Sequence, residues 1–344
     1  MKNKTNLLKA LAIMLVVSGH LEFSLIPMFP PYSFQLALFF FISGMLFNEK
    51  YNFIEYFKRR FNSLLKPYIF YSIAYLGITI AMTPIVGKFW GMDITWYNET
   101  VIAFLTGHQL DLTSPLWFVT QLFVTLIMYY ILNRLHIKTV AYFLISLVAI
   151  QLGAFRGNLY ILLLLKTMFS LLFVHLGHVY ITNIENKYNI LTAKAFWIII
   201  LVQAVLWFTN KDYTPQDGIG LSYILAWGEF DNWIVPIITS LTGIWMSLFI
   251  IDKCYDKIKD SEILHKIGNN TYHIMANHLL VFNVITYLIL WVKGVPFDIK
   301  NTADIYWFYA PLKTTYLYFI AGILIPTYTA ESIKKLVTHK HCQN

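Results

Sequence analysis

The sequence is poor in charged residues and in cysteine. Only 13% of its 344 residues are Asp, Glu, Lys or Arg, whereas 58% are hydrophobic and the mean hydropathy is +0.58. Soluble domains carry about 25% charged residues, so this composition excludes an ordinary soluble protein. The two cysteines, Cys254 and Cys342, exclude a disulfide scaffold, and neither lies in a metal-binding or catalytic thiol motif.

The chain contains long apolar runs. Runs of about 17–25 residues predict membrane-spanning helices. Ten segments are expected to span, three of them shorter than this length, at 6–25, 33–47, 64–86, 115–132, 139–154, 159–181, 195–209, 233–251, 272–292 and 307–330. No repeat, low-complexity tract or soluble extra domain is visible, so we expect residues 1–344 to form a single all-α, polytopic helix bundle.

The distribution of Lys and Arg predicts the orientation of this bundle. With the N-terminus inside, 19 of the 26 basic residues fall at cytoplasmic connections and termini, five in the opposite loops and two within spans. This positive-inside pattern places both termini in the cytoplasm of a multi-pass protein in the cell membrane. The net charge of +8 is explained by this topology, and no nucleic-acid partner is expected.

The first apolar segment, 6–25, carries two ionisable groups in register. Lys9 and His20 are eleven residues apart, which puts them on one helix face about 16 Å apart along the axis. Ionisable residues inside a membrane-length helix indicate a functional site. Glu22 is about 200° from His20 on a regular helix, so we expect it to face another span.

A basic, amphipathic run leads into the third span and contains Lys58, Arg59, Arg60 and Lys66. Two interpretations remain open. Basic residues beside a membrane commonly reflect topology and attraction to anionic lipid. Guanidinium groups also suit phosphate, so the run could bind an anionic cytosolic cofactor.

Four other polar or aromatic residues in the spans are candidates for substrate contacts or for support of the site. Gln121 and Lys166 need partners if they are buried in hydrocarbon. Trp117 is also typical of an aromatic belt at the membrane edge. His278 is about 140° around its helix from His273, so the two cannot form a simple pair.

His175 and His178 share a face, but they lack further ligands of suitable spacing, and no metal site is expected.

Four sequence blocks resemble the acyltransferase-3 family of integral membrane acyltransferases, in particular its fucose-4-O-acetylase-like branch. The blocks are LLKALAIMLVVSGH, with Lys9 and His20 at its marked positions, then FQLALFFFISGMLF, then YFKRRFNSLLKPY followed by PLWFVTQLF, and finally KIGNNTYHIMANHLL, ending at His278. The chain departs from the family pattern at Asn6, where an acidic residue is frequent, and at Ser63, where a second arginine is frequent.

The resemblance implies an O-acyltransferase. The family moves an acyl group, usually acetyl, from cytosolic acyl-CoA to a sugar hydroxyl of an envelope glycan or exopolysaccharide. Acyl-CoA would be a co-substrate, with no permanently bound cofactor, and the acceptor would be a saccharide or lipid-linked glycan beside membrane lipid. His20 would act as general base, and Lys9 with the basic run would bind the CoA phosphates. A homo-oligomer is compatible with the sequence.

Two other classes of protein remain open. A transporter or flippase for a glycan or lipid-linked substrate would use the polar residues as a path, although no inverted repeat supports it. A non-catalytic scaffold for glycan assembly would tolerate loss of both Lys9 and His20. Transfer or hydrolysis of acetyl from acetyl-CoA by the purified protein distinguishes the enzyme from both.

Overall fold

The computed structural model describes residues 2–86, 111–210, 221–230, 232–294 and 314–341, and its regular structure there is helical. The α-helices are α1 (Lys2–Gly19), α2 (Gln35–Met45), α3 (Phe53–Arg60), α4 (Lys66–Val86), α7 (Trp117–Arg134), α8 (Thr139–Leu152), α9 (Leu159–Val179), α10 (Ala193–Thr209), α11 (Val235–Ile258), α12 (Glu262–Asn269), α13 (Thr271–Lys293) and α15 (Thr315–His341). Short 3₁₀ turns cover Asp111–Leu116, Gly153–Phe155 and Leu225–Trp227, and π turns cover Phe61–Leu65 and Tyr180–Ile184.

The expected all-α, polytopic bundle is confirmed. Each of the ten apolar segments contains a helix. Four of the described helical segments are long and apolar enough to cross a membrane, namely Ser114–Arg134, Leu159–Ile184, Val235–Ile258 and Thr271–Lys293, and shorter apolar helices accompany them. The number of crossings remains a prediction.

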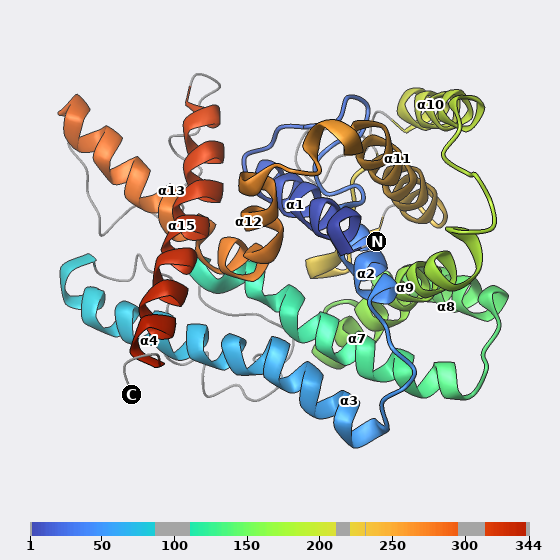
Figure 1. Ribbon diagram of the computed structural model, residues 1–344, viewed down its shortest axis with the longest axis horizontal. Coiled ribbons are helices and arrows are strands. Elements are labelled where there is room, and N and C mark those ends of the chain that lie inside the picture. The colour runs from blue at the N-terminus through green and yellow to red at the C-terminus, as the bar shows by residue number, and fades with distance from the viewer. Residues whose placement is uncertain (1, 87–110, 211–220, 231, 295–313, 342–344) are drawn as a thin grey trace.

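Helix α1 lies at the centre of the bundle, between α2, α11, α12 and α13 (Figure 1). It takes this place because it is apolar around most of its circumference. The side chains of Leu8, Ala12, Ile13, Leu15 and Val17 are each at most 2% exposed. Small residues such as Ala12 also let neighbouring helices approach closely. The candidate residues of the first segment are therefore held on a helix that other helices surround.

Helices α3 and α4 form one continuous rod along the edge of the bundle, joined by the π turn at residues 61–65 (Figure 1). Pro67 explains the turn, because a proline cannot donate to the preceding helical turn and its ring crowds the carbonyl four residues earlier. At the start of the rod, the Asn52 side chain accepts a hydrogen bond from the Glu55 N–H and caps α3. Phe53, Ile54 and Phe57 are exposed, as expected for a helix lying in a membrane interface.

The side-chain contacts of the helix connections form two groups, one at each end of the bundle. At one end of the bundle, Lys4 of α1 pairs with Asp252 of α11 at 2.8 Å, and Arg134 of α7 reaches the carbonyl of Glu49 at 2.8 Å. At the other end, Arg156 pairs with Glu229 at 3.3 Å. The predicted topology places the first group on the cytoplasmic side, and this orientation remains a prediction.

Candidate functional site

His20 occupies the last turn of α1. Its N–H still donates to the Val16 carbonyl at 3.2 Å, as in a regular helix. The following N–H groups turn back, since Phe23 donates to the Ser18 carbonyl and Glu22 to the Gly19 carbonyl. This pattern is a Schellman cap, and Glu22 takes its left-handed position with φ of 57°.

The expectation that one helix continues to residue 25 is therefore wrong. Helix α1 is assigned to Lys2–Gly19, and the cap ends it immediately after His20. Lys9 lies in the regular part of α1 and His20 lies in its last turn, so the two residues still share one helix face. Glu22 is exposed in the cap instead of facing a neighbouring span, so the helical argument made for it does not apply.

The structure brings His20 of α1 against His278 of α13. Their ring centroids are 5.0 Å apart with an interplanar angle of 49°, and Tyr32 meets the His20 ring edge-on at 6.2 Å. His278 is fully buried, whereas His20 as a residue is partly accessible. The Nδ1 atom of His20 and the Nε2 atom of His278 are both buried, and neither has a hydrogen-bond partner among the described residues.

The tautomer of His278 follows from its hydrogen bond to the backbone. Its Nδ1 atom lies 3.0 Å from the carbonyl oxygen of Ile274. Because a carbonyl oxygen only accepts, Nδ1 must carry the proton. In the neutral ring Nε2 is then an acceptor, and it is this acceptor that lacks a donor.

Lys9 lies near the middle of α1, eleven residues before His20, where the positive charge of Arg60 acts on it. The guanidinium of Arg60 lies over the Tyr56 ring at 5.0 Å, and that of Arg59 lies over the Tyr51 ring at 4.1 Å. Two guanidinium groups, two aromatic rings and the polar residues Asn62 and Ser63 line a surface hollow of about 540 Å³. Like charges gathered beside such a hollow are stabilised when an anion binds between them.

The four members of the basic run have different surroundings. Arg59 and Arg60 line the hollow, whereas Lys58 and Lys66 are exposed and do not line it. Arg59 also pairs with Glu55 at 3.2 Å, which is one helical turn away. Arg60 is therefore the member that both lines the hollow and acts electrostatically on Lys9 of α1, which itself lies outside the lining.

A second polar cluster lies between α7 and α9 and gathers three of the predicted residues. Lys166 is fully buried, and its Nζ atom lies 4.7 Å from the centroid of the Trp117 ring. Gln121, also fully buried, donates through Nε2 to the Thr167 hydroxyl at 2.9 Å. Its Oε1 atom has no partner in the described part of the chain. Trp117 thus contacts a buried ammonium group in addition to any role at the membrane edge.

This second cluster connects to the histidine pair through the 3₁₀ turn Asp111–Leu116. The turn directly precedes Trp117 and packs against α13, the helix that carries His278. In the described part of the chain, no contact joins Lys166 to His20. The two polar clusters are therefore neighbouring features of the bundle, linked through one short segment.

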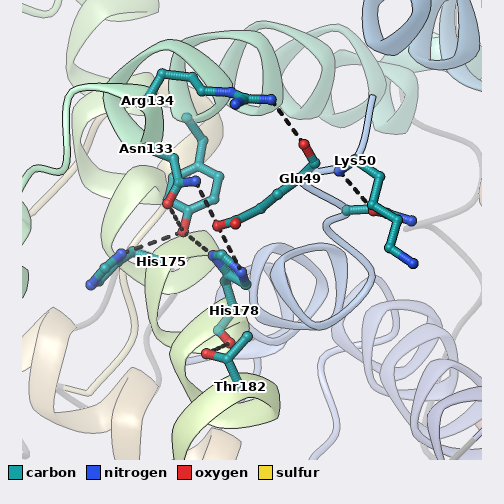
Figure 2. A network of polar contacts seen from close by, with 9 residues as sticks. Glu49, Lys50, Asn133, Arg134, His175, His178 and Thr182 are labelled. Atoms are coloured by element: carbon teal, nitrogen blue, oxygen red, sulfur yellow. Dashed lines mark hydrogen bonds and ion pairs between the residues drawn. The ribbon is translucent and has the colours of Figure 1, made fainter. Parts of the chain in front are cut away.

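His175 and His178 belong to a network that fastens the α2–α3 connection, residues 46–52, to α7 and α9 (Figure 2). Glu49 is held by the Asn133 amide at 2.9 Å and lies 3.5 Å from Nε2 of His178. The Tyr129 hydroxyl lies 2.7 Å from Nδ1 of His178. The Thr139 hydroxyl lies 2.9 Å from Nε2 of His175. Both histidines are thus engaged by protein groups, which accounts for their spacing without a ligand.

The same network positions one wall of the basic hollow. Arg134 donates to the backbone carbonyls of Glu49 and Tyr51, and the Tyr130 hydroxyl donates to the Tyr51 carbonyl at 3.0 Å. Tyr51 carries one of the two rings that line the hollow. The sequence reasoning did not identify this support, nor Tyr56 as the second ring. Their signal is the group of aromatic residues at 51–57 directly before the basic residues at 58–60, a pattern that also fits an interface helix.

These features define a class of protein before any comparison is made. The chain is an integral, multi-pass, helical membrane protein with an inward-facing histidine on a central helix and a cationic hollow at one end. It belongs to the acyltransferase-3 family, because the family's acyltransferase domain matches residues 3–327, nearly the whole chain. The protein is therefore a membrane acyltransferase. Searches of curated proteins and of solved structures gave no match.

Proposed function

We propose that this acyltransferase moves an acetyl group from cytosolic acetyl-CoA to a sugar hydroxyl of a cell-envelope glycan, with His20 as the general base. The observation that carries the proposal is the position of His20. His20 ends the central helix, is partly accessible as a residue, and shares a helix face with Lys9, eleven residues earlier. The resemblance to the fucose-4-O-acetylase-like branch supports a sugar acceptor.

The chemistry requires a base because a sugar hydroxyl is a poor nucleophile at neutral pH. As the hydroxyl oxygen attacks the thioester carbonyl, His20 takes the hydroxyl proton. Collapse of the tetrahedral intermediate breaks the carbon–sulfur bond, and the proton passes from His20 to the leaving CoA thiolate. The products are the acetyl ester and CoA, and no further reactant is consumed.

The donor would enter from the predicted cytoplasmic end. Lys9, Arg59 and Arg60 offer cationic groups for the CoA phosphates, and Tyr51 and Tyr56 offer aromatic faces. The pantetheine arm would then run along α1 and bring the thioester towards His20. Lys58 and Lys66 would contribute through their field rather than by direct contact, because they lie outside the hollow.

The second polar cluster would serve the acceptor or support the site. Lys166, Trp117 and Gln121 supply a cation, an aromatic face and an unpartnered amide oxygen, which suit a hydroxyl-rich ligand. Glu22 would contribute least, because it is exposed in the helix cap. Membership of an acyltransferase family favours this assignment over the transporter alternative.

The test is a comparison of His20→Ala with the parent protein in cells that make the surface glycan. Acetyl ester released from the glycan by mild alkali is measured by mass spectrometry, and protein abundance in membranes is measured in parallel. We expect ester to be lost from the variant at unchanged abundance. Ester at the parental level would refute the role of His20.

A further inference from the structure

The two buried ring nitrogens without partners belong to the two rings that contact each other. Nδ1 of His20 and Nε2 of His278 are both enclosed, and the ring centroids are only 5.0 Å apart. A buried polar atom without a hydrogen bond destabilises the folded protein. As the rings lie in the structure these atoms make no hydrogen bond with each other, and a hydrogen bond between them would satisfy both.

The donor and acceptor in this pair are fixed by the backbone. His278 gives its Nδ1 proton to the Ile274 carbonyl, so its Nε2 atom accepts. The proton between the rings must therefore come from Nδ1 of His20. With Nδ1 protonated, the neutral His20 ring has its lone pair on Nε2. This nitrogen is not among the buried atoms that lack a hydrogen-bond partner.

We propose that His278 is the positioning residue of His20, accepting a hydrogen bond from His20 Nδ1–H and holding the tautomer whose Nε2 is the free base. The inference rests on the proposed function, since it assigns His278 a role through the base. When His20 takes the proton of the acceptor hydroxyl, its ring becomes cationic and the hydrogen bond to His278 becomes charge-assisted. His278 thus stabilises the protonated base as well as orienting the neutral one.

The surroundings of His278 suit this role. Its ring packs edge-on against Phe282 at 5.6 Å, and the residue is fully buried on α13. Phe282 in turn meets Tyr318 of α15 at 5.7 Å, and Gly322 of α15 leaves room for the Phe282 ring. The imidazole is therefore held in place by aromatic packing on one side and by the Ile274 carbonyl on its own helix.

Two substitutions test whether His278 acts by accepting a hydrogen bond or only by filling space. His278→Leu keeps most of the volume and removes the acceptor, whereas His278→Gln can place its amide oxygen where Nε2 lies. With membranes of the expressing cells as acceptor and acetyl-CoA as donor, we expect His278→Leu to lower kcat about 10- to 100-fold. KM for acetyl-CoA should change by less than about two-fold. His278→Gln should recover most of the activity.

His273→Leu is the matched control. His273 lies on the same helix, about 140° around it, and is hydrogen-bonded to the Tyr71 hydroxyl at 2.7 Å. We expect the control to keep kcat within about two-fold of the parent. Equal losses in His278→Leu and His278→Gln, with His273→Leu active, would overturn the inference, because packing alone would then explain the effect.

A spectroscopic measurement tests the tautomer without the acceptor. In ¹⁵N-histidine-labelled protein in lipid bilayers, the His20 signals are identified by their loss in His20→Ala. We expect Nδ1 of His20 to be protonated in the parent and in His278→Gln, and Nε2 to be protonated in a large fraction of His278→Leu. A parent protein with the proton on Nε2 of His20 would overturn the inference.

The outcomes distinguish this inference from the proposed function. Full activity of His20→Ala would remove the base itself and with it the role of His278. Loss of activity in His20→Ala together with full activity in His278→Leu would overturn only the role of His278.

Discussion

Gly44 of α2 and Gly177 of α9 bring the backbones of their helices into direct contact. A Cβ atom on Gly44 would overlap the carbonyl oxygen of Val174, and a Cβ atom on Gly177 would overlap the carbonyl oxygen of Phe41. Each glycine thus faces the backbone of the other helix less than a turn from its counterpart. Small residues allow such close approach between membrane helices.

We therefore expect Gly44→Ala and Gly177→Ala each to destabilise the protein by about 1–3 kcal/mol, since the helices must separate to admit the methyl group. The measurement is thermal unfolding in detergent, followed by fluorescence-detected size exclusion. Gly77→Ala is the control. Nothing lies within 4 Å of a Cβ on Gly77, and alanine is the better helix former there, so its stability should stay the same or rise.

Lys9 and Arg60 should act on donor binding rather than on chemistry. Lys9→Ala and Arg60→Ala are each expected to raise KM for acetyl-CoA roughly 10- to 100-fold, because each removes a charge-assisted hydrogen bond to phosphate. The double variant should lose less than the product of the two factors if both groups hold one phosphate. Lys194→Ala, an exposed lysine on α10, serves as control, and an equal rise in KM there would contradict the proposed donor site.

The Tyr129 hydroxyl should stabilise the attachment of the α2–α3 connection to α7 and α9. Tyr129→Phe removes the hydroxyl next to Nδ1 of His178 and leaves buried nitrogen without its partner, at a cost of about 1–3 kcal/mol. Thermal unfolding in detergent measures the loss. Tyr160→Phe, which changes a hydroxyl on a residue that is 68% exposed, is expected to unfold at the parental temperature. No difference between the two variants would show that the network contributes nothing to stability.

Gln121 should matter for activity and not for folding. The Thr125 and Thr167 hydroxyls next to it already donate to backbone carbonyls at 2.8 Å, so Gln121→Met leaves no donor unsatisfied and removes a buried, unpartnered oxygen. Its stability is expected to stay within about 1 kcal/mol of the parent. Surface ester should fall several-fold if the amide oxygen binds the acceptor. Unchanged ester would confine Gln121 to packing.

Glu331 should make stability depend on pH. Hydrogen bonds from Asn270, at 2.7 Å, and from Lys334, at 3.0 Å, lower the pKa of Glu331 from its ordinary value of 4.5. A lowered pKa stabilises the folded state above the unfolded value, and this stabilisation is lost as the pH falls below about 4.5 and through the folded pKa. Melting temperatures measured from pH 6 to pH 3.5 should therefore fall more steeply for the parent than for Glu331→Gln. Parallel curves would exclude this contribution.

Much of the bundle was predictable from the sequence, because the physical rules that govern it are local. A run of apolar residues such as 159–181 must satisfy its backbone hydrogen bonds internally in a membrane and becomes a helix wherever it packs. The end of α1 was less predictable. Its cap depends on Glu22 adopting a left-handed conformation, which is uncommon for a residue other than glycine and gives no clear sequence signal.

The amino-acid sequence by itself determined the family, the helical class and the alignment of Lys9 with His20 on one face, because spacing along a helix fixes direction. Only the tertiary structure decided which distant residues meet these two. It placed His278 against His20 across 258 positions of sequence, and Arg60 within electrostatic range of Lys9. Such pairings depend on how α1, α3 and α13 pack together, and helical periodicity within one segment carries no information about its neighbours.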